Sequence, residues 1–277
     1  MSQTRCREPG DPQQTTFVAT DGAAYDLQMG RWSRRLAEPF LDFAAPGAQA
    51  RVLDLGCGTG SLAQALVARA PGIRVVGVDP SGAYVSHARR KLRDPRIAFE
   101  VADARDLPFP DADFDAVLAL LVLPFVPDTA AALAQMRRVA RPGAVVAAAS
   151  WDSRGGYVAQ RIFLDTAAML DDDAAALRAR NCTRPTMRPG ELAVAWRAAG
   201  LHDVREATLS IRMEFADFDD YWAPYLGRQG PAADYVAGLD SAARARLREH
   251  VRRAYLDGEA DGPRSYAATA WAVRGLA

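Results

Sequence analysis

The chain has 277 residues, of which 49% are hydrophobic and 25% charged, a balance that fits a soluble globular protein of one large or two small domains. Lysine and arginine number 34, as do aspartate and glutamate, so the formal net charge is zero and there is no overall attraction to nucleic acid or anionic lipid. The three cysteines and three histidines are scattered, and no apolar run reaches the ~20 residues of a membrane span. We therefore expect a cytoplasmic protein with no metal site and no nucleic-acid or membrane partner.

The N-terminal part divides into a polar stretch and a helical one. Residues 1–16 are polar and contain prolines and a glycine, which predicts a disordered lead-in without the apolar core of a signal peptide. From Asp21 to Phe43 aromatic and aliphatic residues recur at helical spacing, which predicts one or two amphipathic helices. We expect residues 17–45 to form an N-terminal lid at the start of a single domain over residues 17–277.

Between residues 50 and 151 the pattern alternates between strands and helices. The predicted strands are Arg51–Leu55, Ile73–Val78, Arg96–Val101, Phe114–Leu121 and Ala144–Ser150, and the predicted helices are Ser61–Ala70, Ser81–Leu92 and Asp128–Ala140. Asp128 is the expected N-cap of the last helix, and Arg141-Pro142-Gly143 is expected to be a turn. Strands joined by such helices form right-handed crossovers on a parallel sheet, so the segment predicts a doubly wound α/β core.

After Trp151 the pattern becomes mainly helical. Helices are predicted over residues 156–180, Glu191–Ala199 and 217–256, and strands over Val204–Met213 and Tyr266–Val273. We interpret segments 152–200 and 214–262 as a helical lid inserted into the same domain.

A glycine-rich segment, Asp54-Leu55-Gly56-Cys57-Gly58-Thr59-Gly60, joins the first strand to the first helix of the core. Glycines there let the backbone approach a ligand at which the helix N-terminus points. A dinucleotide fingerprint would place its third glycine at position 61, where Ser61 stands. An acid at position 54 suits a ligand with an ammonium group and would repel a pyrophosphate. A tight turn without a ligand is the alternative.

Acidic side chains also follow the next two strands. Asp79 ends the second strand, where a carboxylate can accept hydrogen bonds from both hydroxyls of a ribose, although it could instead cap the following helix. Asp103 follows the third strand, where it can accept from an adenine amino group or be a solvated loop acid.

Together these residues resemble the class I S-adenosylmethionine (SAM)-dependent methyltransferases, and more narrowly the group typified by the ubiquinone and menaquinone biosynthesis enzymes. The matching stretches, within about residues 50–150, are Val52–Gly60, Gly77–Pro80, Ala102–Ala104, Phe114–Asp115 and Met136–Gly143. The resemblance implies a Rossmann-like, mostly parallel, seven-stranded sheet with one antiparallel strand near the C-terminus, which fits Tyr266–Val273. It also implies an enzyme with SAM (S-adenosyl-L-methionine) as cofactor, which transfers a methyl group by in-line displacement to an O-, N- or C-nucleophile.

The resemblance implies roles for individual positions as well. Asp54 would lie near the methionine end of the cofactor, Ala119 and Leu120 would line the methyl-donor region, and Tyr25 and Arg34 would reach the cofactor carboxylate unless their segment is only a packed helix. The implied cofactor-binding residues are Tyr25, Met29, Arg34, Asp54, Gly56, Cys57, Gly58, Gly60, Asp79, Pro80, Asp103, Ala104, Ala119 and Leu120.

The sequence assigns no catalytic residue. Relatives often carry a polar residue after the fourth strand, where this chain has Leu123-Pro124-Phe125. Transfer from an activated donor needs a base only if the acceptor must lose a proton. The same region lacks the Asn/Asp-Pro-Pro-aromatic tetrapeptide of enzymes that methylate DNA bases.

The expected acceptor is a small molecule. Only the composition of the predicted lid indicates which class of small molecule it is. The lid residues that favour an apolar or aromatic acceptor are Trp151, Tyr157, Phe163, Met187, Tyr221, Trp222 and Tyr225, unless they only form core. The arginines that could hold an acidic group on the acceptor, unless they are solvated as most arginines are, are Arg31, Arg34, Arg184 and Arg188. The alternatives are a non-catalytic SAM-binding regulatory protein, an NAD-dependent oxidoreductase or a protein methyltransferase, and the oligomeric state is open.

Overall fold

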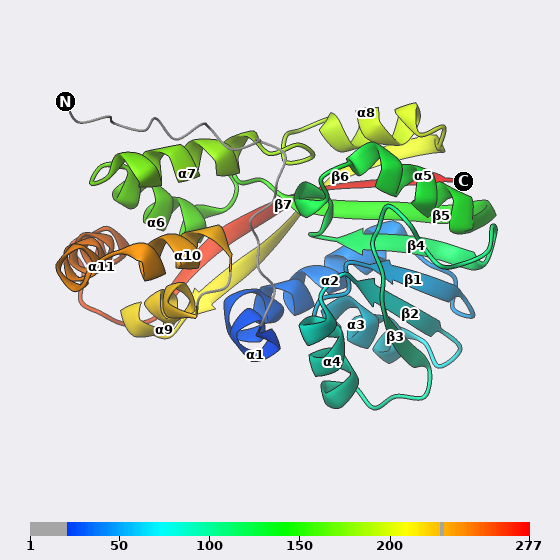
Figure 1. Cartoon of the computed structure of the whole chain (residues 1–277), viewed down its shortest axis with the longest axis horizontal. Helices are drawn as coiled ribbons and strands as arrows, with labels where there is room; N and C mark the ends of the chain where they lie inside the picture. The colour runs from blue at the N-terminus through cyan, green and yellow to red at the C-terminus, as the bar shows by residue number, and fades with distance from the viewer. Residues whose placement is uncertain (1–20, 228–229) are drawn as a thin grey trace, which may run out of the picture.

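A seven-stranded sheet forms the centre of the computed structural model, which describes residues 21–227 and 230–277 (Figure 1). The strand order is β3-β2-β1-β4-β5-β7-β6, and β7 is antiparallel to both of its neighbours while β1 to β5 pair in parallel. The strands are β1 (Arg51–Leu55), β2 (Arg74–Asp79), β3 (Ile97–Val101), β4 (Phe114–Leu120), β5 (Ala140–Trp151), β6 (His202–Phe215) and β7 (Arg264–Leu276). The predicted Rossmann-like sheet with one antiparallel strand is confirmed. The lead-in predicted for residues 1–16 lies outside the described residues.

Helices connect these strands and supply the remaining structure. Those of the N-terminal segment and the sheet are α1 (Gly22–Tyr25), η1 (Asp26–Gly30), α2 (Arg31–Ala44), α3 (Ser61–Arg69), α4 (Gly82–Lys91), η2 (Leu123–Phe125), α5 (Thr129–Val139) and α8 (Glu191–Ala198). Those of the lid are α6 (Val158–Ala168), α7 (Asp172–Thr183), α9 (Phe218–Trp222), η3 (Ala223–Leu226), α10 (Pro231–Gly238) and α11 (Ser241–Leu256). As predicted, Asp128 caps α5, with its carboxylate accepting from the Ala131 amide at 2.9 Å.

Helices cover both faces of the sheet because successive strand residues point to opposite sides and both sides are apolar. In β1, Val52 contributes to the core that α2, α3 and α4 cover, whereas Leu53 and Leu55 contribute to the core under α5 and α8. This arrangement is the predicted doubly wound architecture. It leaves the carboxyl ends of β1, β2 and β4 facing the lid.

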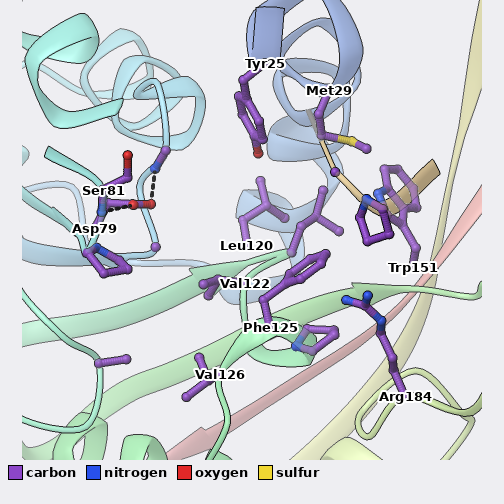
Figure 2. Close-up of a pocket in the computed structure, with 18 of the residues that line it drawn as sticks. Tyr25, Met29, Asp79, Ser81, Leu120, Val122, Phe125, Val126, Trp151 and Arg184 are labelled. Carbon is purple, nitrogen blue, oxygen red and sulfur yellow. Dashed lines mark hydrogen bonds between the residues drawn. The ribbon is translucent and has the colours of Figure 1, made fainter. Parts of the chain in front are cut away.

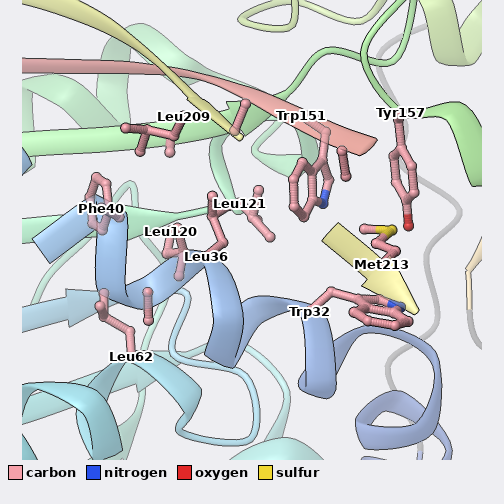
Figure 3. Close-up of a cluster of buried hydrophobic side chains, with 14 of the residues drawn as sticks. Trp32, Leu36, Phe40, Leu62, Leu120, Leu121, Trp151, Tyr157, Leu209 and Met213 are labelled. Atoms are coloured by element: carbon pink, nitrogen blue, oxygen red, sulfur yellow. The ribbon is translucent and has the colours of Figure 1, made fainter. Parts of the chain in front are cut away.

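The lid shares one hydrophobic core with a face of the sheet. Figure 3 shows Trp32 of α2 beside Met213 and Leu36 of α2 beside Leu120, and these residues belong to one buried cluster with Trp151 and Tyr157. The long strands β6 and β7 extend beyond the other strands into the lid, where α6, α7 and α9 to α11 surround them (Figure 1). The shared core holds the lid against the carboxyl ends of the strands.

Two expectations about chain segments require correction. Arg141-Pro142-Gly143, expected to be a turn, lies within β5, where the pairing with β4 shifts register between Phe114 and Ala116 and a positive φ of 77° at Gly143 absorbs the irregularity. Helix α8, within the segment predicted as lid, packs instead against β6 and β7, because its apolar face of Leu192, Ala193 and Trp196 completes the core beside α5.

The described residues lack two kinds of feature. None of the helices there combines the length and apolarity that crossing a bilayer requires. Nor do three or more His, Cys, Asp or Glu side chains within residues 21–227 and 230–277 come together as a metal site would need.

Candidate active site

A cavity of about 630 Å³ lies where the carboxyl ends of β1, β2 and β4 meet the N-terminal segment and the lid. Figure 2 shows its two sides: Asp79 and Ser81 lie on one, and Trp151 and Arg184 on the other. We call the part lined by the glycine loop and the ends of β2 and β3 the loop half. The part lined by η2, β5, α6, α7 and the segment after α7 is the lid half.

The glycine loop, residues 56–60, gives the loop half a backbone surface. Gly56 and Gly58 have φ values of 70° and 52°, in the left-handed region that L side chains rarely adopt. A Cβ atom at Gly56 would lie 2.2 Å from Cγ2 of Val122, so any side chain there would displace a wall of the cavity. The loop is anchored by the amides of Gly56 and Cys57, which donate to the Val78 carbonyl at 2.8 and 2.9 Å.

Asp79 is buried at the end of β2 and faces the cavity. One carboxylate oxygen accepts from the Gly58 amide at 3.0 Å and the other from the Ser81 amide at 2.9 Å (Figure 2). The alternative role as helix cap is taken by Ser81, whose hydroxyl accepts from the Tyr84 amide. Because an ionised carboxylate offers about four acceptor positions, Asp79 keeps capacity for two hydroxyl donors. Burial raises its pKa.

Asp54 lies beneath the glycine loop and does not line the cavity. Its side chain is 1% exposed and accepts from the Ala63 amide in the first turn of α3. The other oxygen, Oδ2, is buried and has no hydrogen-bond partner among the described residues. Burial raises the pKa of this carboxyl to about 7. A nearby cation would stabilise the ionised form of this carboxyl and so lower its pKa.

Asp103 lines the cavity after β3 and is more exposed than Asp79. Its carboxylate pairs with the Arg105 guanidinium at 2.7 Å and accepts from the Arg105 amide at 2.9 Å. The hydrogen bond from Arg105 lowers the pKa of Asp103 and keeps it an acceptor at neutral pH. Pro80 and Ala104, the residues that follow Asp79 and Asp103, line the cavity with apolar surface.

The N-terminal segment closes the loop half from above. Tyr25 and Met29 line the cavity, and the Tyr25 ring lies 4.8 Å from the ring of Tyr84. Asp26 ties the segment down, because its carboxylate accepts from the Thr59 hydroxyl at 2.5 Å and from the Lys91 ammonium at 2.6 Å.

The fourteen residues expected to bind the cofactor fall into three groups. Those that line the cavity are Tyr25, Met29, Gly56, Gly58, Asp79, Pro80, Asp103, Ala104 and Leu120. Those that form or support the strand and loop beneath it are Asp54, Cys57, Gly60 and Ala119, of which Ala119 points to the opposite face of the sheet from Leu120. Arg34 requires correction: it is exposed on the outer face of α2, since the inner face is occupied by Trp32, Ser33 and Leu36, and it does not line the cavity.

The lid half is mainly apolar with a few polar groups. Of the aromatic residues noted in the sequence, Trp151 and Tyr157 line the cavity, whereas Phe163, Trp222 and Tyr225 pack against one another inside the lid. The sequence did not single out four further lining residues, Gln160, Leu164, Leu177 and Asn181. Their helical spacing is visible in the sequence, but which side of each helix faces the cavity depends on contacts between distant segments.

No side chain that titrates near neutral pH lines the lid half among the described residues. Its ionisable groups are the Tyr157 hydroxyl, whose pKa burial raises, and the Arg184 guanidinium. This half can therefore position a molecule and donate hydrogen bonds to it, but it offers no group poised to remove a proton.

The cavity joins a loop half with acidic side chains to a mainly apolar lid half, and comparison with known proteins identifies the class of the protein. The family model for a methyltransferase domain matches residues 52–143. Two relatives are demethylmenaquinone methyltransferases: that of Thermus thermophilus is 44% identical over 41% of this chain and 50% of its own length, and that of a Roseiflexus species is 38% identical over 58% of this chain and 71% of its own. This chain thus spans half of the first relative and more than two thirds of the second.

A solved structure with the same fold is phosphoethanolamine N-methyltransferase 2 of Haemonchus contortus in complex with SAM. It shares 16% identity at a TM-score of 0.59, over 95% of this chain and 58% of that one. This chain belongs to the SAM-dependent methyltransferases, and SAM is its cofactor. The resemblance drawn from the glycine loop and the acids at the strand ends is confirmed.

Proposed function

We propose that the chain transfers a methyl group from SAM, held in the loop half, to an apolar or aromatic small molecule held in the lid half. The observation that carries this proposal is that one cavity joins the two halves. Asp79 and Gly58 line it at one end, and Trp151 and Tyr157 line it at the other. A shared cavity lets a cofactor and an acceptor lie in contact while the lid excludes water.

The loop half fits the parts of SAM. The two free acceptor positions of Asp79 suit the ribose hydroxyls, and Asp103, kept ionised by Arg105, suits the adenine amino group. The unpartnered oxygen of Asp54 beneath the loop would interact favourably with the positive charge of the ammonium group of SAM. Tyr25 and Met29 would cover the bound molecule. When bound, SAM supplies a methyl group on a positively charged sulfur, activated for transfer to a nucleophile.

The lid half fits an apolar acceptor better than a polar one. Leu164, Leu177 and Met187 line it together with Trp151 and Tyr157. The two demethylmenaquinone methyltransferase relatives support an acceptor of this kind, since the substrate that gives them their name is a quinone. Without a group poised to remove a proton, the described residues would act by aligning the acceptor with the methyl group.

The test is an assay of S-adenosylhomocysteine (SAH) formation with 1,4-naphthohydroquinone, catechol and 2-naphthoate as acceptors. We expect at least one to raise the rate of SAH formation above that without acceptor, and Asp79→Ala to abolish this increase. Asp111→Ala, which removes an exposed acid paired with Arg138 away from the cavity, is the matched control. SAM binding without acceptor-dependent turnover for any of the three would favour the non-catalytic alternative.

A further inference from the structure

Arg184 places a positive charge in the lid half. It lies in the segment between α7 and α8 and lines the cavity. Its guanidinium carbon lies 4.7 Å from the centre of the Phe125 ring, and Figure 2 shows the side chain directed from the cavity floor toward that ring. The stacking on Phe125 fixes the direction of the guanidinium without neutralising it.

This guanidinium has no ionic partner among residues 21–227 and 230–277. Its Nη1 atom is buried and makes no hydrogen bond there. The charge that acts on it most is Arg180, of the same sign, and burial together with Arg180 lowers the pKa of Arg184. Other arginines around the lid differ in this respect: Arg178 and Arg161 both pair with Asp165.

A partly buried charge without a partner carries a desolvation cost, so a cavity that keeps one is suited to a ligand of opposite charge. A guanidinium is a planar fork of donors that matches a carboxylate with two parallel hydrogen bonds. The surrounding residues suit an aromatic body for that ligand, because Phe125, Trp151 and Tyr157 line the same half. Trp151 adds an indole N–H that is buried and has no partner among the described residues.

We propose that Arg184 binds a carboxylate on the methyl acceptor, so that the substrate class of this enzyme is an aromatic acid. This inference rests on the proposed function, since it places the acceptor in the lid half. It assigns to Arg184 the selection of the acceptor and no part in binding SAM, which lies on the other side of the cavity.

The experiment measures binding of two probes of nearly equal shape to the full chain saturated with SAH. Isothermal titration calorimetry compares 2-naphthoate, which carries the carboxylate, with 2-naphthamide, which does not. We expect 2-naphthoate to bind at least about tenfold more tightly. Arg184→Gln should bring the two affinities together, and Arg184→Lys, which keeps the charge but loses the fork, should leave an intermediate preference.

Arg188→Gln is the matched control. Arg188 belongs to the same segment, pairs with Glu191 at 3.6 Å and does not line the cavity, so its loss should leave the preference unchanged. Equal affinities of the two probes for the wild-type protein, or no binding of 2-naphthoate at millimolar concentrations, would overturn the proposal. So would a preference that survives in Arg184→Gln.

SAH affinity, measured in the same samples, separates this inference from the proposed function. It should be unchanged in all three variants. If the wild-type protein fails to bind SAH, the proposed function fails; if it binds SAH and shows no preference for 2-naphthoate, only the role of Arg184 fails. Should Arg184→Gln not fold, the wild-type preference and its reduction in Arg184→Lys decide the question.

Discussion

The loop half and the lid half of the cavity are built in different ways. The loop half is a backbone surface at consecutive strand ends, with Gly56, Gly58 and Asp79 lying within 24 residues of one another. The lid half is assembled from side chains of β5, α6, α7 and the segments around them. The backbone surface of the loop half determines how closely a ligand can approach it. The construction of the lid half leaves the shape of the chamber to side chains that can change without disturbing the sheet.

The two halves also differ in charge. The carboxylates of Asp79 and Asp103 line the loop half, and the carboxyl of Asp54 is buried beneath its loop, whereas the Arg184 guanidinium lines the lid half. Acids on one side suit a cationic cofactor, and a cation on the other suits an anionic acceptor. The following substitutions probe this division, in order of decreasing expected effect.

Asp79→Ala should have the largest effect because it removes the acceptor that we propose for two ribose hydroxyls, together with the acceptor of the Gly58 amide. We expect SAH affinity to fall by about 100-fold or more, measured by calorimetry. Asp111→Ala should bind SAH like the wild type. Unchanged affinity in Asp79→Ala would mean that the ribose is held elsewhere.

Asp54→Asn tests whether the buried acid destabilises the protein when no cation is near. The folded-state pKa of about 7 lies above the ordinary value of 3.8, so the stability that Asp54 contributes is present at low pH and is lost progressively as the pH rises from about 3.8 to about 7. Asparagine keeps an acceptor for the Ala63 amide and does not titrate. From pH 5 to pH 8 the wild type should lose about 2–3 kcal/mol of unfolding free energy relative to the variant.

Urea unfolding of both proteins at the two pH values measures this difference, and saturating SAH should reduce it if the ammonium group lies near Asp54. A difference that is independent of pH would contradict the raised pKa. A difference that SAH leaves unchanged would place the ammonium group away from Asp54.

Gly56→Ala tests the backbone surface itself. The left-handed φ costs ~1 kcal/mol for an L residue, and the new Cβ must push Val122 toward the cavity. We expect SAH affinity to fall about tenfold in a protein that still folds. Gly82→Ala, in a helix where a Cβ meets nothing closer than 4.0 Å, is the control and should bind SAH normally. Equal SAH affinity in the two variants would contradict a close approach of the cofactor at Gly56.

Leu177→Ala should have the smallest effect on SAH affinity. Leu177 is 6% exposed and lines the lid half from α7, so its truncation widens the chamber. We expect SAH affinity to stay within about twofold of the wild type while 2-naphthoate affinity falls severalfold. The reverse pattern would show that the two halves are not separate in function.

The sequence predicted the loop half far better than the lid half, for a physical reason. Asp54, Gly56 and Asp79 stand where local strand-to-helix turns put them, so their positions follow from the alternation of strands and helices. The position of Arg184 depends on how α7 packs against α6 and on the contact of Arg184 with Phe125 of η2. Both are contacts between residues far apart in the chain. Arg34 shows the same limit, since helical spacing alone did not reveal which face of α2 is buried.

The structure also differs from the sequence-based prediction at two places where contacts between distant segments decide the outcome. Arg141-Pro142-Gly143 carries the residues of a turn, yet it continues β5, because Ala140 and Val145 on either side pair with β4 and the Gly143 amide donates to the Ala277 carbonyl. Trp222, which resembled a pocket residue, is 3% exposed and fills the lid core beside Phe163 and Phe218. In each case tertiary contacts override the local pattern.

We expect SAM to lie in the loop half with its methyl group toward the lid half. A crystal structure of the protein with SAH tests this placement most directly. We expect both ribose hydroxyls within hydrogen-bond distance of the Asp79 carboxylate, adenine beside Asp103, and the sulfur beyond Gly56 facing Trp151. A ribose bound away from Asp79, or an adenine in the chamber lined by Tyr157 and Arg184, would contradict it.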